Sequence, residues 1–357
     1  MKKKWLYRLA LCLCMVIGLA ACTNTENNGT TTTPTATEKE YKLGMGVVVK
    51  TDSSKTGNAQ VDATVATVVL DADGKIVACR IDVAQNKMNV TDGAVDTAKT
   101  FETKMELGDR YGMAGKVDNN GDGVMKEWYE QTKAFEAYVV GKTVAEVEAI
   151  QTQEAGGHQI AVDEALLSAG CSMQITEFKE AVVKACKDEQ GMTFKTAAEF
   201  TLGVAAKSTV DAATKAATAE EDGVVAMYSD FACAVIADGK VLATLNDAIQ
   251  PKIAITAAGE IGETTFVGTK RELKEDYNMA KFGQPNVEGG TVKEWYVQSA
   301  AFSAHVVGMT ADEIKGMETK EVNAHQIPVD EALLSAGCTM QITDICAVVA
   351  QAAANAR

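Results

Sequence analysis

Two short clusters of small and nucleophilic residues are the places where this sequence could do chemistry. They lie in a 19-residue stretch that occurs twice, as HQIAVDEALLSAGCSMQIT (residues 158–176) and as HQIPVDEALLSAGCTMQIT (residues 325–343). A turn of small residues ahead of a helix leaves backbone N–H groups free, and such groups attract an anion such as a phosphate. The candidate contacts for such an anion are Gly170, Cys171, Ser172, Gly337, Cys338 and Thr339.

The same clusters also fit a purely structural role. Cys171, Met173 and Ile175 alternate with polar residues, which is the period of a half-buried strand. This alternation predicts that Ser172 and Thr339 are ordinary residues on the solvent side of that strand.

Short helices are predicted on both sides of each cluster. Asp163 and its counterpart Asp330 are predicted to cap the helix before the cluster, which Gly170 or Gly337 would end. The helix after the cluster is predicted to be capped by Thr176 in the first copy and by Thr343 in the second.

A cysteine and a histidine recur in each copy, as they would in a Cys–His nucleophile. His158 accompanies Cys171, and His325 accompanies Cys338. A nucleophile of this kind needs a third group to orient its base, and none stands out. We therefore assign no catalytic residue and read these residues as part of the core.

One loop matches the start of a calcium-binding loop. Asp118, Asn120 and Asp122 place side-chain oxygens at alternate positions before a glycine. The twelfth position is Tyr129 instead of the bidentate glutamate. These residues are a candidate metal site, and a polar turn is the alternative.

The elements that must position these clusters also occur twice. Val61–Val69 and Ile76–Val83 read as two strands joined by a turn at Asp73-Gly74. Phe231–Ile236 and Val241–Leu245 repeat the hairpin. A fixed order of motifs at a nearly constant offset indicates an internal duplication. The sequence predicts an α+β protein of two tandem repeats, each a small antiparallel sheet with packed helices.

A patterned helix follows each predicted sheet, at residues 126–140 and 293–307. Its aromatic and apolar residues recur at helical spacing, which predicts one buried face in each helix. The residues on these two faces are Trp128, Phe135, Val139, Trp295, Phe302 and Val306. Capping boxes at Thr143 and Thr310 are predicted to open the next helix of each repeat.

The N-terminal residues read as a targeting segment. Residues 1–21 combine a basic start with an apolar stretch too short to cross a membrane as an ordinary helix. They end in Leu19-Ala20-Ala21-Cys22, which resembles the lipobox of bacterial lipoproteins. That resemblance implies that Cys22 carries a lipid and anchors the protein on the extracytoplasmic face of the cell membrane.

Residues 22–40 lack large apolar side chains before Tyr41 and are predicted to be a disordered tether. The whole chain has a formal net charge of −15. Loss of the basic signal peptide would make it more acidic still. A body of this charge repels phosphate backbones, so we expect no nucleic-acid partner.

The cysteines predict no duplicated disulfide framework. Cys171 and Cys338 occupy matching positions, whereas the other cysteines after residue 22 have no cysteine counterpart. Three disulfides remain possible by number, and buried free thiols are the favoured interpretation. The cysteines concerned are Cys79, Cys171, Cys186, Cys233, Cys338 and Cys346.

Three features together resemble the FMN-binding domain family, in its tandem lipoprotein form from Gram-positive surface electron-transfer systems. They are the hairpin with Asp-Gly-Lys-Ile at residues 73–76, the Lys-Glu-Trp-Tyr helices, and the Ala-Gly-Cys-Ser/Thr blocks at residues 169–172 and 336–339. In flavinylated members a Ser/Thr-Gly-Ala-Thr sequence carries FMN as a phosphoester on its threonine. The resemblance implies FMN contacts at the six cluster residues named above.

This chain departs from the family pattern at three positions in each block. Alanine replaces the first serine or threonine, cysteine replaces the alanine, and Leu166 or Leu333 stands where the family has an aspartate. Only the second block ends in threonine, at Thr339. If either repeat holds flavin, we therefore expect the second to do so, by non-covalent binding.

The resemblance implies a membrane-anchored lipoprotein that binds flavin and passes electrons to a redox partner at the cell surface. It implies an electron-transfer protein and not an enzyme. The alternative is a surface module that keeps the duplicated fold and binds no cofactor. The predicted folded parts are residues 41–187 and 197–350, joined by a linker around residues 187–198.

Overall fold

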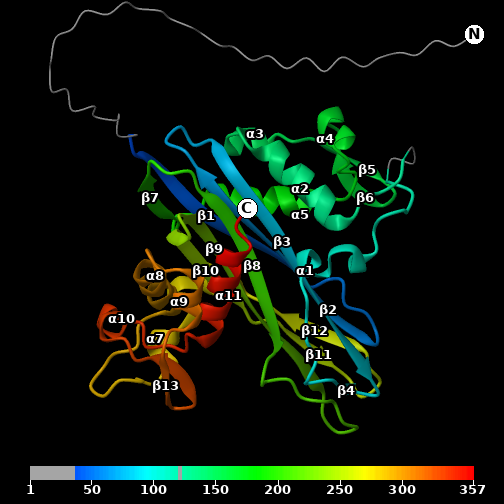
Figure 1. Cartoon of the computed structure of the whole chain (residues 1–357). Helices are drawn as coiled ribbons and strands as arrows, with labels where there is room; N and C mark the ends of the chain where they lie inside the picture. The colour runs from blue at the N-terminus through cyan, green and yellow to red at the C-terminus, as the bar shows by residue number, and fades with distance from the viewer. Residues whose placement is uncertain (1–36, 120–122) are drawn as a thin grey trace, which may run out of the picture. The chain divides into compact units, whose positions relative to one another are not determined.

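The computed structural model describes residues 37–119 and 123–357. The predicted signal peptide, Cys22 and residues 22–36 of the tether lie outside these ranges, as do Asn120 and Asp122. Within them, helices accompany antiparallel sheets, so the predicted α+β class is confirmed (Figure 1). None of the helices in the described ranges is long and apolar enough to span a membrane.

The N-terminal half builds a sheet with the strand order β4-β3-β2-β1-β7, in which all neighbours are antiparallel. The predicted hairpin is confirmed, and its strands extend well beyond the predicted segments. The strands of this sheet are β1 (Lys39–Lys50), β2 (Asn58–Leu70), β3 (Ile76–Thr91), β4 (Ala94–Val95) and β7 (Met192–Thr196).

Helices and a small hairpin follow this sheet along the chain. The second strand of the hairpin formed by β5 and β6 begins the first copy of the duplicated stretch. These elements are α1 (Lys104–Leu107), the 3₁₀ helix η1 (Gly108–Tyr111), α2 (Trp128–Val139), α3 (Val144–Glu148), β5 (Thr152–Ala155), β6 (His158–Ala161), α4 (Glu164–Ser168) and α5 (Thr176–Cys186).

The C-terminal half builds a second antiparallel sheet with the order β10-β9-β11-β12, and β8 pairs with β9. Pro251 separates β10 from β11, whereas the corresponding β3 runs without a break. Proline has no N–H for the ladder, which explains the interruption. The strands are β8 (Thr201–Val210), β9 (Gly223–Ala237), β10 (Lys240–Ile249), β11 (Lys252–Ile255) and β12 (Ile261–Thr265).

The helices of the C-terminal half follow in the same order as those of the N-terminal half. One additional short helix, α7, stands before the long helix α8. The elements are α6 (Lys270–Leu273), η2 (Lys274–Tyr277), α7 (Met279–Phe282), α8 (Trp295–His305), α9 (Ala311–Lys315), β13 (Thr319–Val322), β14 (His325–Pro328), α10 (Glu331–Ala336) and α11 (Thr343–Ala354).

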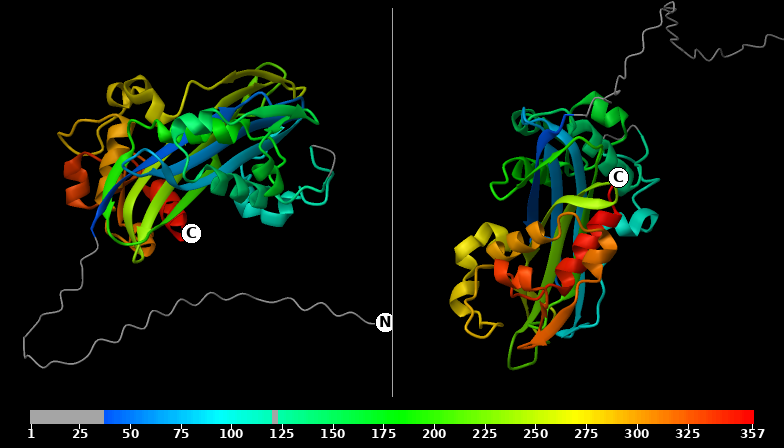
Figure 2. Two further views of the ribbon diagram at one scale, coloured as in Figure 1. Left: turned by 90° about the horizontal axis from the view of Figure 1, so that it is seen from above. Right: turned by 60° about the vertical axis from the view of Figure 1, so that its left-hand side comes forward.

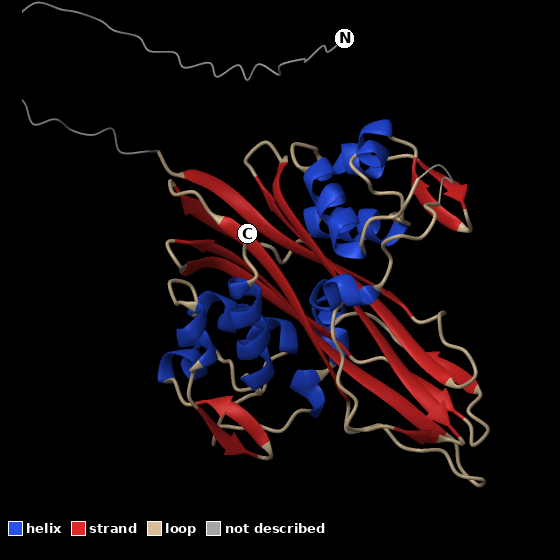
Figure 3. Ribbon diagram, turned by 45° about the vertical axis from the view of Figure 1, so that its right-hand side comes forward, coloured by secondary structure: helices blue, strands red, loops and turns tan. Residues whose placement is uncertain are grey.

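The two sheets share one hydrophobic core. Apolar residues of β1, β2 and β3, such as Val47 and Val61, cluster with residues of β8, β9 and β10, such as Leu202 and Phe231. The strands lie between two groups of helices, which cover the outer faces (Figures 1 and 2). Figure 3 shows the same layers by element type. Residues Glu38–Arg357 accordingly form one compact unit.

Each outer face carries a second cluster of buried side chains between sheet and helices. The residues predicted to line the helix faces are all buried: Trp128, Phe135 and Val139 in α2, Trp295 and Phe302 in α8, and Val306 directly after α8. Their burial confirms the interpretation of both aromatic stripes as anchors of helix on sheet.

The C-terminal helix of each half lies close against a glycine of its sheet. A Cβ atom on Gly44 would lie 2.1 Å from the carbonyl oxygen of Ala185 in α5. A Cβ atom on Gly203 would lie 1.9 Å from the carbonyl oxygen of Ala352 in α11. Glycine at these positions therefore sets the close approach of helix and sheet.

The boundaries between parts differ from the sequence prediction in two places. Strand β1 begins at Lys39, inside the predicted tether, because Lys39 and Glu40 pair with β7. The predicted linker at residues 187–198 contains β7, which completes the edge of the first sheet. Residues 41–187 and 197–350 thus contribute opposite faces of a shared core.

The strand predicted at residues 171–176 is wrong. Residues 171–175 form neither strand nor helix, although Cys171, Met173 and Ile175 are buried as the alternation requires. Ser172 is also buried, at 6% exposed, so it does not face solvent as predicted.

The predicted caps of the last helices are also wrong. Thr176 and Thr343 are the first helical residues, and Ile175 and Ile342 stand at the N-cap positions without a side-chain hydrogen bond. The other predicted caps are confirmed. Asp163 and Asp330 cap α4 and α10, and capping boxes open α3 and α9.

Candidate functional site

The C-terminal half contains a cavity of about 760 Å³ beside the second copy of the duplicated stretch. Its wall includes Thr339, the predicted contact that resembles the family's attachment residue. Strands, loops and helices of the same half contribute the other sides. The residues used below are Tyr228 and Asp230 of β9, Lys270 of α6, Tyr277 of η2, Trp295 of α8, and Asp344 of α11.

Lys270 is a buried cation in this wall, at 6% exposed. Its ammonium group donates a hydrogen bond of 2.9 Å to the hydroxyl of Tyr228. The same nitrogen lies over three aromatic rings, 4.6 Å from the centroid of Tyr228, 4.8 Å from Tyr277 and 5.4 Å from Trp295. Such an arrangement holds a cation by attraction to the ring faces.

A carboxylate balances this cation electrostatically. Burial lowers the pKa of Lys270 to about 8, although the negative charge of Asp230 opposes the shift. Burial likewise raises the pKa of Asp230 to about 7, and Lys270 opposes that shift. Each group therefore favours the charged form of the other.

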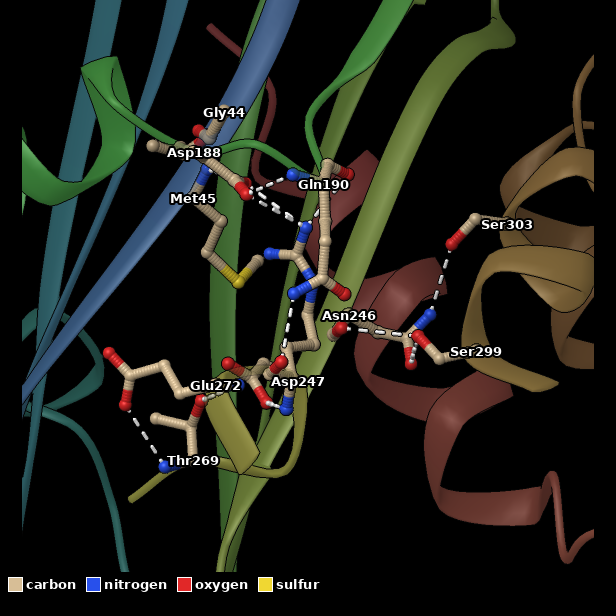
Figure 4. Close-up of polar contacts among 12 residues, drawn as sticks. Gly44, Met45, Asp188, Gln190, Asn246, Asp247, Thr269, Glu272, Ser299 and Ser303 are labelled. Carbon is tan, nitrogen blue, oxygen red and sulfur yellow. Dashed lines mark hydrogen bonds and ion pairs between the residues drawn. The ribbon is translucent and has the colours of Figure 1, made fainter. Parts of the chain in front are cut away.

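A buried ion pair joins α6 to the N-terminal half (Figure 4). Arg271 follows Lys270 directly, and its guanidinium donates to both carboxylate oxygens of Asp188, at 3.2 and 3.0 Å. It also donates to the carbonyl oxygen of Gln190. Asp188 and Gln190 stand between α5 and β7, so this contact joins the two halves of the fold.

Thr339 is fixed through its backbone, and its side chain is half-buried. Its N–H donates to the side-chain oxygen of Gln298 at 2.8 Å. Its carbonyl oxygen accepts from the side-chain nitrogen of Asn286 at 2.9 Å. These two bonds position the residue at the cavity wall without using its hydroxyl group.

The other two candidate contacts of this half do not line the cavity. Cys338 is fully buried in the outer core. Gly337 ends α10 in the left-handed conformation, with φ of 92°. A Cβ atom on Gly337 would lie 2.4 Å from the ammonium nitrogen of Lys293, which donates to the carbonyl oxygen of Ala336 at 3.0 Å. The positive φ is what favours glycine there, since the end of the lysine side chain could move aside.

The N-terminus of α11 opens into the same cavity. Asp344 and Ile345, in the first turn of this 12-residue helix, belong to the cavity wall. No side chain caps this end. Uncapped N–H groups and the helix dipole favour a bound anion. Lys207 forms an ion pair of 2.6 Å with Asp344, and its positive charge offsets the negative charge of this aspartate.

The N-terminal half has a corresponding but smaller cavity of about 460 Å³. Lys104 takes the place of Lys270, over the rings of Tyr111 at 4.9 Å and Trp128 at 5.5 Å. Lys104 is only half-buried. An ion pair between Lys50 and Glu177 stands at the wall of this cavity.

Ser172 does not line the N-terminal cavity, unlike its counterpart Thr339. Its backbone has the same partners: Gln131 accepts its N–H at 2.9 Å, and Asn119 donates to its carbonyl oxygen at 2.9 Å. Cys171 is fully buried, and Gly170 follows α4 with a positive φ of 94°. The structure therefore places one of the six predicted contacts in a cavity wall.

A Cys–His nucleophile does not fit this geometry. Burial raises the pKa of Cys171 and that of Cys338 to about 12 in each case, so neither forms a thiolate near neutral pH. His158 and His325 are exposed at their cavities, so the interpretation of these two histidines as core residues is wrong. All six cysteines of the described ranges are buried and free.

The candidate metal site falls partly outside the described residues, which include Asp118 but not Asn120 or Asp122. The backbone N–H of Asp118 donates to the carbonyl oxygen of Gly123 at 3.1 Å. Among the residues that the structure describes, no cluster of histidine, cysteine and acidic side chains could hold a metal ion.

Sequence reasoning missed Lys270, Tyr228 and Asp230. A signal was present for the lysine, because Thr-Lys-x-Glu-Leu recurs at residues 103–107 and 269–273. In both copies the threonine and glutamate form a capping box, which fixes the short helix that presents the lysine. No repeated motif marks Asp230.

Comparison with known proteins gives one partial match. The chain is 35% identical over 99 residues to a chlorophenol reductase of Desulfitobacterium hafniense. This is similarity to part of a reductase. The match covers 24% of this chain and 29% of the reductase, which is too little to establish a family. No family model and no solved structure matches the chain.

Proposed function

We propose that this protein is an extracytoplasmic, lipid-anchored electron-transfer protein that binds FMN in its C-terminal half. The observation that carries the proposal is the position of Thr339. It lies in the wall of a 760 Å³ cavity together with three aromatic rings, a buried lysine and an uncapped helix N-terminus. Ligand cavities of 300–1,000 Å³ with apolar walls and a few polar groups are typical of small-molecule sites.

The residues present fit the two ends of a flavin mononucleotide. The first turn of α11 and the hydroxyl group of Thr339 would take the phosphate, since a helix N-terminus favours an anion and the two backbone bonds of Thr339 do not use its hydroxyl. Tyr228, Tyr277 and Trp295 would contact the ring system, and Lys270 would hold a polar edge of the ligand. When bound, FMN supplies the capacity to accept and release electrons.

We propose non-covalent binding as the mode of attachment. The departures from the flavinylation pattern, at Ala336, Cys338 and Leu333, remove features that an attaching enzyme would recognise. Leu333 is aliphatic and fully buried, so it offers such an enzyme neither a polar group nor an accessible surface. The partial similarity to a chlorophenol reductase supports a redox role, since that protein is named for a reduction.

We also propose that the two halves are tandem copies of one fold. The same contact from a lysine side chain to the backbone recurs in each half. Lys126 donates to the carbonyl oxygen of Ala169 at 2.9 Å, as Lys293 does to that of Ala336 at 3.0 Å. The N-terminal copy has a smaller cavity that Ser172 does not reach, which supports a single flavin in the C-terminal copy.

The decisive test is the colour of the protein purified from its native host. We expect a flavin absorption spectrum, and we expect acid precipitation to release the colour into the supernatant because the FMN is not covalently bound. Colour that stays in the pellet and is lost in Thr339→Ala would instead show a phosphoester at Thr339. A colourless protein that also fails to take up added FMN would refute electron transfer and leave a cofactor-free surface module.

The membrane anchor is tested separately at Cys22. The basic start, short apolar stretch and Leu-Ala-Ala-Cys sequence predict lipidation of this residue. We expect Cys22→Ala to leave the precursor unprocessed or to release the protein from membranes. A variant that is processed and retained on membranes like the wild type would contradict the assignment.

A further inference from the structure

We propose that the buried ion pair between Arg271 and Asp188 fixes Lys270 in the C-terminal cavity, which makes Arg271 a positioning residue for the ligand site. The inference rests on the proposed function for the identity of the ligand. It concerns, however, a property of the protein that can be measured without any ligand.

The argument begins with the shortness of α6. This helix runs only from Lys270 to Leu273, and a segment of this length has little stability of its own. Lys270 lies in the cavity wall, whereas the next residue, Arg271, lies in the contact between the two halves. Whatever holds Arg271 therefore also limits the movement of Lys270.

The contact at Arg271 is built from charged and backbone groups out of water. The side chains of Arg271 and Asp188 are 7% and 8% exposed. Asp188 also accepts the backbone N–H of Met45 at 3.0 Å, so it is fixed to β1 (Figure 4). Gln190 donates from its side chain to the carbonyl oxygen of Arg271 at 2.8 Å. Removal of one partner would leave the other charge buried and unpaired.

A second anchor ties the same helix to its own sheet. The backbone N–H of Arg271 donates to the carboxylate of Asp247 in β10 at 3.0 Å. Asp82 has the equivalent role in the N-terminal half, where it accepts the N–H of Met105 at 3.2 Å. Since both halves share this anchor, it cannot explain a difference between their lysines.

The N-terminal half offers an internal comparison because it lacks the ion pair. Met105 follows Lys104 where Arg271 follows Lys270, and Asn355 follows α11 where Asp188 follows α5. A cavity of about 270 Å³ lies here, lined by residues that include Met105 and Asn355. Lys104 is half-buried, whereas Lys270 is buried over three rings. The half with the ion pair is thus the half with the enclosed lysine.

The experiment measures how fast each lysine of the full-length protein reacts with formaldehyde and cyanoborohydride. Mass spectrometry of peptides gives separate rates for Lys270 and Lys104 in one sample. In the wild type we expect Lys270 to react at least about tenfold more slowly, since labelling would require local opening of α6.

Two variants separate positioning from general stability. Arg271→Met removes one charge, and Arg271→Met with Asp188→Asn copies the pair found in the N-terminal half. We expect the double variant to fold with a melting temperature near that of the wild type, since replacing both charges of a buried ion pair with neutral side chains leaves no buried charge unpaired. We nevertheless expect its Lys270 to react about tenfold faster than in the wild type, with the rate of Lys104 unchanged.

Lys274→Met is the matched control. It removes the neighbouring but exposed ion pair with Glu189, which spans 3.7 Å, and leaves Arg271 intact. We expect the slow reaction of Lys270 to persist in this variant. If the folded double variant keeps Lys270 as protected as in the wild type, the ion pair is merely structural and the proposal is wrong.

The outcome does not depend on flavin. A protein that binds no FMN would refute the proposed function, while the labelling rates would still decide the role of Arg271. If FMN does bind, we expect the double variant to bind it about tenfold more weakly than Lys274→Met does, since loss of a fixed contact reduces preorganisation.

Discussion

Among single residues, Asp82 makes the folding stability depend on pH. It is 2% exposed, and burial raises its pKa to about 6 despite the hydrogen bonds that it accepts. The ordinary value of about 3.9 applies to the unfolded chain. Between about pH 4 and pH 6 the folded protein therefore binds the extra proton, and its stability falls as the pH rises through this window.

We expect Asp82→Asn to flatten this part of the stability curve. The amide oxygen can still accept the N–H groups of Val83 and Met105, and no carboxylate has to ionise in the core. At pH 7 the variant would gain on the order of 2 kcal/mol. Urea unfolding at several pH values measures the effect, with the exposed Asp312→Asn as the control. If the free energy of unfolding of the variant falls with pH as steeply as that of the wild type, Asp82 does not cause this pH dependence.

Residue identity favoured Thr339 over Ser172, but it could not show which of the two residues lines a cavity. The two stand at matching positions with the same backbone partners, yet only Thr339 lines a cavity. The difference arises from neighbours far away in sequence, such as Tyr228 and Asp230 of β9. A single sequence can propose such positions as a pair, and tertiary packing decides between them.

For the elements, the close packing of helix on sheet gives a sharp mutational test. We expect Gly203→Ala to destabilise the protein by about 1–3 kcal/mol or more, because its Cβ would meet the backbone of α11 and a backbone cannot rotate away. Gly44→Ala should behave alike against α5. Chemical denaturation measures both effects.

Gly74→Asn is the comparison for this test, since nothing lies within 4 Å of a Cβ atom at that position and asparagine tolerates its left-handed backbone. We expect Gly74→Asn to reduce the free energy of unfolding by clearly less than Gly203→Ala does. Equal losses in all three variants would mean that backbone freedom, and not contact with the helices, explains the glycines.

Sequence patterns predicted most helices and strands correctly, but the strand predicted at residues 171–176 is wrong. The helices around Trp128 and Trp295 were predictable because their apolar period is strong. The alternation at residues 171–175 reports burial correctly but not strand geometry. Side-chain bonds from Gln131 and Asn119 satisfy the backbone here, so no neighbouring strand is needed.

At the scale of the described unit, the shared core predicts cooperative unfolding. Phe135 packs outside the first sheet and Phe302 outside the second, and both are fully buried. We expect either one, changed to alanine, to lower the same single thermal transition, at a cost of about 3–5 kcal/mol. Calorimetry with Phe282→Ala as control, a residue that is 73% exposed, tests this. Two transitions, each sensitive to one variant, would show that the halves unfold separately.

The arrangement of the two sheets could not be predicted from the sequence. Strands buried on both faces read as continuous apolar runs, so the sequence does not reveal which face meets helices and which meets another sheet. Asn86 illustrates the point. It looks like a solvent-side residue, but it is 1% exposed and donates to Ser208 and Ser229 across the two halves.

Face-to-face packing of the sheets has a consequence for the ancestry of the chain. If the two halves are tandem copies, as proposed above, a protein with a single copy would expose the apolar sheet face that the other half now covers. It would be expected to pair with a second molecule through that face, as a symmetric homodimer. Fusion into one chain would free the copies to diverge everywhere except at this face. The different cavities in the two halves are what such freedom would produce.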